Sequence, residues 1–368
     1  MKSVYTLGSV IFFLNLTACL ESSNKILPVE NTPLNKFINN SAGLTPVENL
    51  GKLVFFDPNL SSPVGQSCAS CHNPFYACSD PSHQSVSEGA VKGQFGTRNA
   101  PALTYLSFAP TLFYSQTDST YVGGLFWDGR AKSLEDQAHF PLLNPSEMNN
   151  SDSLDIVTKI AAADYATNFQ TLYGNGFFDD KNKAFKVIMN VIASYEKSFQ
   201  FKPFTSKYDY YLNGQTDLTA QELRGLDLFN GDKAKCINCH PSDVGDFGAV
   251  LFTDFTYDNI GLPSNAKQQG PRDLGLAVTT NDPAQNGRFK VPSLRNVTLT
   301  APYFHNGFFT NLKDAVRFYS QRDIPGKFPA PEVPETVNKE ELGNLNLTEE
   351  EMDDIVAFLN TLTDGYQP

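Results

Sequence analysis

Two short stretches, SCASCHNP at residues 67–74 and KCINCHPS at residues 235–242, decide the fold of this 368-residue chain. Each holds two cysteines separated by two residues, and a histidine directly follows the second cysteine. This is the attachment signature of a c-type haem, because two thiols add to the vinyl groups of one porphyrin and the histidine binds its iron. The chain is therefore expected to carry two covalent haems, at Cys68, Cys71 and His72 and at Cys236, Cys239 and His240.

Two other uses of paired cysteines compete with haem attachment. A zinc ribbon places its two C-x-x-C pairs about 15–20 residues apart, whereas 164 residues separate Cys71 from Cys236 here. A redox-active dithiol remains the second alternative, although such motifs seldom carry the following histidine twice. Of the six cysteines, only Cys19 and Cys78 lie outside the motifs.

The first residues read as an export leader rather than as part of the fold. Lys2 precedes an apolar run, Val4–Leu16, which is too short to span a bilayer comfortably. The residues Leu16-Thr17-Ala18-Cys19 resemble the lipobox of bacterial lipoproteins, with ordinary signal cleavage as the alternative. We expect a signal peptide at 1–19, a polar tether at 20–40, and a periplasmic or surface protein that meets the membrane through a lipid anchor only. Leu20 favours the outer membrane by resemblance to bacterial sorting rules.

The composition and net charge of the chain limit the kinds of macromolecule that it can bind. The chain is 40% hydrophobic and 12% aromatic, which is enough to bury a substantial core, and its formal net charge is −12. Nucleic acid is excluded as a partner because its phosphates would repel such a chain. A basic or neutral protein is compatible with this charge.

Helix signals surround both motifs. Capping boxes begin at Thr45, Thr219 and Thr348, each with glutamate three residues later and apolar residues beyond. A further apolar pattern over 185–199 marks a helix between the motifs. The sequence therefore predicts a mainly α protein: two cytochrome c-like haem domains with long irregular loops. The N-terminal peroxidatic domain would span 41–205 and the C-terminal electron-transfer domain 206–368.

Long ordered motifs add a family resemblance. They are LGKLVFFDPNLS at 50–61, GTRNAPAL at 96–103, FWDGRAKSLEDQAHFPLLNPSEM at 126–148 and FKVPSLRNVTLTAPYFHNGFF at 289–309. With these the chain resembles the bacterial dihaem cytochrome c peroxidase and MauG superfamily, in its MauG/MbnH-like branch. The resemblance implies a peroxide-reactive N-terminal haem and a C-terminal haem that transfers electrons.

The resemblance also implies roles for single residues. Trp127, the only tryptophan, matches the residue between the haems, although it can also be read as a core aromatic. Gln137 and Glu147 match the pair above the N-terminal haem, where a carboxylate moves a proton between the peroxide oxygens. Glu147 could otherwise be a helix-start charge. Pro141 lies between them and is expected to shape the distal wall.

One calcium ion is implied by resemblance alone. Asn99, Thr300 and Pro302 match its ligands, the last two through backbone carbonyls. Calcium favours such oxygen ligands. Without the resemblance these would be loop residues.

The sixth iron ligands distinguish the branches. The loop VSEGAVKGQFGTRNAP at 86–101 lacks the histidine with which resting bacterial peroxidases close the first haem, and His83 is out of register. At the second haem the usual methionine position is occupied by Tyr319, as in MauG-like members, and no methionine lies between Met189 and Met352. A phenolate lowers the iron potential, whereas methionine raises it. His305 is a rival ligand, and Tyr319 could instead be a core residue of a helix over 312–319.

Three functions compete. The leading prediction is a hydrogen-peroxide-dependent enzyme that oxidises a partner protein side chain, tryptophan being favoured, by sharing both oxidising equivalents between two haems. The alternative is a cytochrome c peroxidase that reduces hydrogen peroxide to water with electrons from a small cytochrome or cupredoxin. A non-catalytic electron carrier gains nothing from an open, acid-lined iron. One departure weakens the first reading: the surface tryptophan that MauG has two residues before the second motif is Ala234 here.

Overall fold

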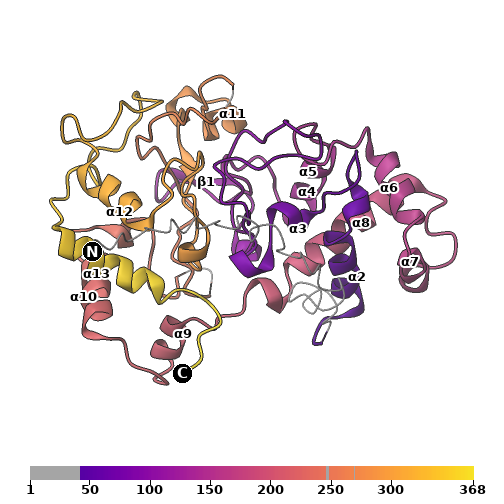
Figure 1. The fold of residues 1–368 in the computed structure, drawn as a ribbon, viewed down its shortest axis with the longest axis horizontal. Helices are drawn as coiled ribbons and strands as arrows, with labels where there is room; N and C mark the ends of the chain where they lie inside the picture. Colours follow the sequence, from indigo (N-terminus) through magenta and orange to yellow (C-terminus); the bar gives the residue numbers. More distant parts are fainter. Residues whose placement is uncertain (1–41, 246–247, 269) are drawn as a thin grey trace, which may run out of the picture. The chain divides into compact units, whose positions relative to one another are not determined.

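The computed structural model describes residues 42–245, 248–268 and 270–368, and Figure 1 shows their arrangement. The leader, lipobox and tether predicted for residues 1–40 lie outside these described residues. The helices are α2 (Pro46–Phe55), α3 (Cys68–Cys71), α4 (Leu134–Gln137), α5 (His139–Leu143), α6 (Ser153–Ala161), α7 (Ala166–Tyr173), α8 (Lys181–Glu196), α9 (Lys207–Leu212), α10 (Ala220–Asn230), α11 (Leu276–Thr280), α12 (Leu312–Gln321) and α13 (Glu349–Asn360). The strands are β1 (Phe113–Ser115), β2 (Thr120–Val122), β3 (Tyr257–Asp258) and β4 (Phe289–Lys290). Helices and irregular loops dominate, as the sequence predicts.

The strands form two short antiparallel pairs. In the first, Phe113 lies opposite Val122 and Tyr114 opposite Tyr121. In the second, Tyr257 lies opposite Lys290. Because side chains alternate between faces along a strand, Phe113 and Val122 share one face of the β1–β2 hairpin and the tyrosine pair lies on the other.

The three predicted capping boxes are confirmed. The side chains of Thr45, Thr219 and Thr348 each accept a hydrogen bond from the backbone N–H of the glutamate three residues later. The carboxylate of that glutamate in turn accepts a hydrogen bond from the threonine N–H. This reciprocal pairing satisfies two backbone donors that a helix start otherwise leaves open. The helix predicted over 185–199 begins earlier and ends at Glu196, and Phe199 belongs to a separate 3₁₀ turn.

The helix before each haem motif crosses a later helix at a glycine. A Cβ on Gly51 of α2 would lie 1.8 Å from the Val191 carbonyl oxygen of α8. A Cβ on Gly225 of α10 would lie 1.9 Å from the Asp354 carbonyl oxygen of α13. Both glycines stand six residues after their capping threonine. The two halves therefore repeat one helix-crossing arrangement, in which only glycine lets the backbones touch.

Each half encloses its own apolar core. In the N-terminal half the core gathers α2, α6 and α8, with Val54, Ile156 and Ile188 fully enclosed. In the C-terminal half it gathers α10, α12 and α13, with Phe318 and Phe358 fully enclosed. Cys236 of the second motif packs against the C-terminal core. The first motif packs instead in a separate small cluster, in which Ala69 and Cys68 lie with Phe55, Tyr195 and Phe201.

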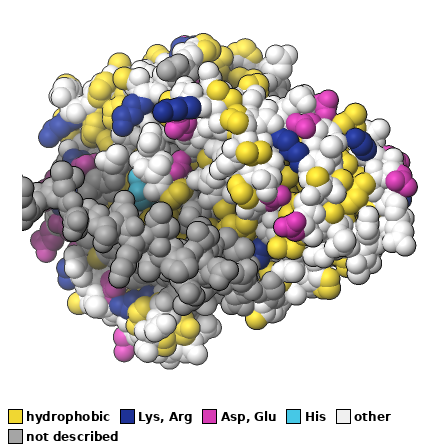
Figure 2. Space-filling model, turned by 45° about the vertical axis from the view of Figure 1, so that its right-hand side comes forward, with side chains coloured by type: hydrophobic (Ala, Val, Ile, Leu, Met, Phe, Trp, Pro, Cys, Tyr) yellow, Lys and Arg dark blue, Asp and Glu magenta, His cyan; other side chains and the backbone are white. Residues whose placement is uncertain are grey.

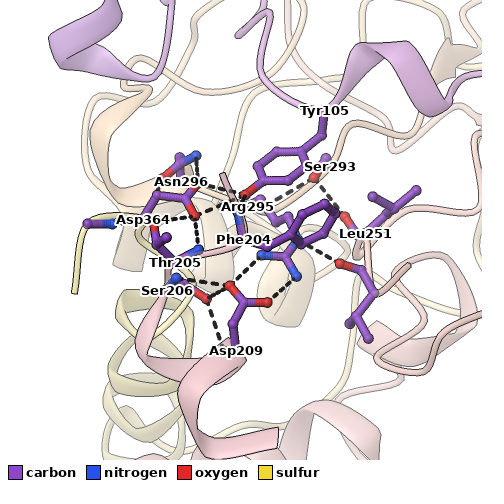
Figure 3. A network of polar contacts seen from close by, with 12 residues as sticks. Tyr105, Phe204, Thr205, Ser206, Asp209, Leu251, Ser293, Arg295, Asn296 and Asp364 are labelled. Carbon is purple, nitrogen blue, oxygen red and sulfur yellow. Dashed lines mark hydrogen bonds and ion pairs between the residues drawn. The ribbon is translucent and has the colours of Figure 1, made fainter. Parts of the chain in front are cut away.

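A polar network ties the connecting segment to both halves (Figure 3). The Tyr105 hydroxyl donates to Asp364 at 2.8 Å and accepts the Phe204 N–H at 3.1 Å. Arg295 pairs with Asp209 at 2.8 Å, and its guanidinium lies 4.9 Å from the centre of the Tyr105 ring. The domain boundary predicted between residues 205 and 206 falls in this joint and stays a prediction.

The surface gives no sign of a membrane-spanning element within the described ranges, where none of the helices has the length and apolar character to cross a bilayer. On the face shown in Figure 2, acidic and basic side chains are interspersed among apolar ones.

Candidate haem and peroxide site

The first motif lies on the short helix α3 and its C-terminal cap. Cys68 and Cys71 are free thiols, each partly accessible to solvent, and do not pair with one another in a disulfide. The His72 Nδ1 lies 3.0 Å from the Cys78 carbonyl oxygen, so this nitrogen carries the proton and donates it. Burial lowers the pKa of His72, with the Cys78 carbonyl and Asp80 opposing the change. The neutral ring therefore directs Nε2, with its lone pair, to a metal.

The second motif repeats this local geometry on a 3₁₀ turn, Cys236–Asn238. The His240 N–H donates to the Cys236 carbonyl at 2.9 Å, as the His72 N–H does to that of Cys68. The His240 Nδ1 donates to the Phe252 carbonyl at 2.8 Å. Burial lowers the pKa of His240 to about 4, so its Nε2 is also unprotonated at neutral pH.

Both motifs thus fit a c-type haem. Each offers two free thiols for attachment and one neutral imidazole whose tautomer is fixed by a carbonyl, which is the donor set that a haem iron needs. A zinc knuckle would need two thiol pairs together, whereas each pair lies in its own half of the molecule. Cys78, the cysteine outside the two motifs, has a buried free thiol. Its backbone carbonyl accepts the hydrogen bond that orients His72.

Tyr319 projects from α12 toward the second motif. Burial raises the pKa of its phenol, and Cys239, Asp258 and Cys236 add to the change because they lie close enough to act on it. A phenol in this setting ionises only if a cation replaces its proton, which a ferric iron does. The charges of both cysteines of the second motif thus act on Tyr319, and its ligation of an iron stays a prediction.

His305, the rival ligand, has different neighbours. Its ring stacks on Phe289 at 3.4 Å between centres, and its Nε2 is buried without a hydrogen-bond partner in the described part of the chain. Burial lowers the pKa of His305 to about 3, with smaller effects from Asp273 and Arg98. His305 thus lies among Phe289, Asp273 and Arg98, whereas the cysteines of the second motif act on Tyr319. Which of the two side chains binds the second iron stays a prediction.

Glu147 stands near the first motif. Burial raises the pKa of its carboxyl, and Asn144, whose Nδ2 donates to it at 2.8 Å, and Arg130 oppose the change. The same carboxylate acts on the Cys71 thiol, which places the two groups close together. Gln137 is half-buried at the end of α4, and Pro141 lies in α5. A half-buried carboxyl with a raised pKa suits proton transfer near neutral pH.

The loop over 86–101 packs on this wall without bringing a histidine. The Ala90 N–H donates to the Glu147 carbonyl at 2.7 Å, and a Cβ on Gly89 would lie 2.3 Å from the Ser146 carbonyl oxygen. His83 is exposed and its Nδ1 donates to the Ala301 carbonyl at 2.9 Å. His83 therefore has a partner in the other half of the chain. His139 is half-buried, and its Nδ1 lies 3.9 Å from Asp136.

Trp127 occupies the region where the halves meet. Its Nε1 donates to the Asn99 carbonyl at 2.9 Å, and its own carbonyl accepts the Lys290 N–H at 2.9 Å. The Asn99 N–H in turn donates to the His305 carbonyl at 2.8 Å. The indole is thus fixed by its bond to Asn99, while the backbone of Trp127 bonds to Lys290 in the other half. The relay role of Trp127 stays a prediction.

The predicted calcium ligands fall in the same region. Asn99 is buried and lies beside the segment over 301–305. Its N–H donates to the His305 carbonyl, and His83, from the loop before it, donates to the Ala301 carbonyl. Thr300 and Pro302 belong to this segment, and the Thr300 hydroxyl donates to the Val297 carbonyl, leaving its own carbonyl to other partners. Amide and carbonyl oxygens are ligands that calcium accepts. The ion itself stays a prediction.

Some charged groups near the site were not singled out from the sequence. Lys290 is buried beside Trp127, and its ammonium donates to the Gly124 carbonyl at 2.9 Å. Burial lowers the pKa of Lys290 to about 8, with Asp128 opposing. Lys290 lies in the motif FKVPSLRN, but only the fold shows that its backbone N–H bonds to the Trp127 carbonyl. Asp254 and Asp258 lie near Cys239, and burial raises the pKa of Asp254 to about 6.

Comparison with known proteins gives concordant matches. The family described as "Di-haem cytochrome c peroxidase" matches residues 46–217. The methylamine utilization protein MauG of Paracoccus denitrificans is 38% identical over 87% of this chain and 89% of its own length. The cytochrome c551 peroxidase of Nitrosomonas europaea is 33% identical over 87% of this chain and 80% of its own. Among solved structures, the diheme peroxidase BthA of Burkholderia thailandensis E264 superposes with a TM-score of 0.78 at 35% identity, covering 87% of this chain and 86% of that chain.

Proposed function

Since the chain belongs to the family of dihaem cytochrome c peroxidases and MauG proteins and is a hydrogen-peroxide-dependent oxidoreductase, we propose that it oxidises a side chain, preferably tryptophan, of a partner protein. The observation that carries the proposal is Tyr319 at the second motif, where the bacterial peroxidases it resembles have methionine. The lack of a histidine in the 86–101 loop supports it from the first motif. When bound, the two haems would supply the irons that take up the two oxidising equivalents of one peroxide.

The protein side chains have separable roles. His72 and His240 would hold the irons through Nε2, because their Nδ1 atoms are fixed by the Cys78 and Phe252 carbonyls. Glu147 accepts a proton from one peroxide oxygen and delivers it to the other, so that this oxygen leaves as water. Gln137 is the neutral partner that holds the peroxide in place.

The second half of the reaction removes electrons. Trp127, fixed between Asn99 and Lys290, provides an aromatic step between the two haem sites. Tyr319, as a phenolate, would bind the second iron, where an anionic ligand favours the oxidised state. Two electrons leave the partner's side chain and, with two protons, complete the reduction of peroxide to two waters.

The alternative is a peroxidase that draws the same two electrons from a small cytochrome or cupredoxin. The similarity to cytochrome c551 peroxidase and the charge of −12, which suits a basic donor, favour it. Both readings need Glu147. They differ in whether the oxidised enzyme reacts with peroxide before any donor has reduced it.

The test is a titration of the fully oxidised dihaem protein with one equivalent of hydrogen peroxide and no donor, followed by absorption and EPR. The proposal predicts immediate loss of both ferric EPR signals and a long-lived product. If the protein reacts only after one haem has been reduced, the first site is closed at rest and the alternative holds. Asp164→Asn, a change at an exposed carboxylate in the α6–α7 loop, serves as the matched control.

A further inference from the structure

A cavity of about 1080 Å³ opens beside Cys239. It lies between the β1–β2 hairpin, the segment around the second motif and the segment over 336–341. Asn238, Cys239 and Pro241 of the second motif contribute to its walls, whereas His240 and Tyr319, the proposed iron ligands, do not. The cavity therefore adjoins the second motif at Cys239, a residue to which a haem would be attached.

The walls of the cavity are acidic. Six carboxylate side chains line it against two cationic ones, Arg288 and Lys339. The carboxylates are Asp118, Asp243, Asp254, Asp258, Glu340 and Glu341. Acidic side chains therefore outnumber cationic ones by four in this lining.

Neutral groups hold the deepest carboxylates in place. Asp258, Glu341 and the Cys239 sulfur lie within 4.8 Å of one another. Asn338 donates to Asp258 at 2.7 Å and to Glu341 at 2.8 Å, and Asn238 donates to Glu341 at 3.1 Å. Amide donors orient a carboxylate without cancelling its charge, so the negative field at the Cys239 edge persists.

The rim of the cavity adds exposed apolar surface. Phe113 of the hairpin is 50% exposed and Val244 is 55% exposed, and both line the cavity. Exposed aromatic side chains next to a charged recess are typical anchors of protein interfaces. The recess thus combines an apolar rim with an anionic floor.

We propose that this cavity is the docking site of the partner protein, which inserts a lysine- or arginine-bearing segment between the hairpin and the acidic floor. The inference rests on the proposed function and names the surface that serves it. A partner docked here would lie beside Cys239, to which the second haem would be attached; when bound, that haem would accept the partner's electrons, with peroxide as the terminal oxidant. This route needs no aromatic residue at Ala234, which is buried.

The test uses the dihaem protein with Asp243→Lys and Glu340→Lys, two exposed carboxylates at the mouth. The probes are a reduced, lysine-rich small cytochrome c and hydroquinone, a small neutral donor, each oxidised at the expense of peroxide. We expect the ratio of kcat/KM for the cytochrome to that for hydroquinone to fall about tenfold or more at low ionic strength, and the difference to shrink at high salt. A second variant, Phe113→Ser, should raise the KM for the cytochrome at every ionic strength.

The control carries the same change of charge elsewhere, Asp164→Lys and Asp179→Lys, both exposed in the N-terminal half. It should leave both donors unaffected. An unchanged ratio in the cavity variant, or an equal fall in the control, would overturn the docking site while oxidation of hydroquinone still upheld peroxide chemistry. If neither donor is oxidised by the unmodified protein, the proposed function fails and the inference fails with it.

Discussion

Replacing Glu196 by glutamine should make the protein less sensitive to alkaline pH. Glu196 ends α8 with 5% of its surface exposed, and its Oε2 has no hydrogen-bond partner among the described residues. Burial raises the pKa of this carboxyl to about 8; Glu135 adds to the change and Lys197 opposes it. The folded protein therefore holds a proton here that the unfolded chain loses at a much lower pH.

The size of the effect follows from that difference. A rise from 4.5 to about 8 is about 3.5 pKa units, and each unit corresponds to about 1.4 kcal/mol. Because the folded pKa is the higher one, the stability contribution is complete below pH 4.5, declines as pH rises, and is lost once the pH passes about 8. Glutamine keeps the shape of the protonated acid but does not titrate. Above pH 8 we expect Glu196→Gln to exceed the original protein in unfolding free energy by about 3–5 kcal/mol, relative to their difference at about pH 5.

The assay is denaturant unfolding of both proteins, with haems attached, at intervals across this pH range. Asp164→Asn, an exposed carboxylate, is the control and should follow the original protein at every pH. Parallel curves for Glu196→Gln and the original protein would refute the argument from burial. If the parallel curves are also offset, with the variant less stable at every pH, the carboxyl makes a favourable bond that glutamine cannot make.

Three further predictions address the site and the joint. Glu147→Gln should slow the reaction with peroxide by about 10²–10⁴-fold in stopped-flow measurements while the haem spectra stay intact. The rate of the original protein should fall as the pH falls through the raised pKa of Glu147, and the variant should lack this pH dependence. Tyr319→Phe removes the anionic ligand and should raise the potential of the second haem in spectroelectrochemistry, and an unchanged potential would argue against ligation. Tyr105→Phe should lower the unfolding free energy by about 1–3 kcal/mol, because the Phe204 N–H and the Asp364 carboxylate each lose a buried partner; a thermal melt of the holoprotein checks this.

Features that depend on neighbouring residues could be predicted from the sequence. The capping boxes at Thr45, Thr219 and Thr348 need only residues three apart, and all three form. The haem motifs are equally local, because the histidine follows its cysteine directly. Sequence reasoning also anticipated α12 over 312–319, which extends to Gln321.

Features made by distant segments could not be predicted in this way. Glu196 ends an amphipathic helix and reads as a surface charge until the fold encloses it near Cys68 and Cys78. The acidic cavity assembles three segments that are more than 75 residues apart in the chain, β1–β2, the second motif and residues 336–341. No periodicity or spacing carries that information, since it arises from how the halves pack.

The two motifs share an attachment signature but differ in the charges around them. Beside Cys71 stands Glu147, a carboxyl whose raised pKa suits it to release and recover a proton. Beside Cys239 stand Asp258 and Glu341, held by amides that keep them in place. A proton-transfer group is useful where peroxide must be cleaved, whereas fixed negative charge is useful where an oxidised centre must be stabilised and a cationic partner attracted. The same carboxylates would thus serve potential and docking together, so neutralising them should weaken partner binding and raise the potential of the second site at once.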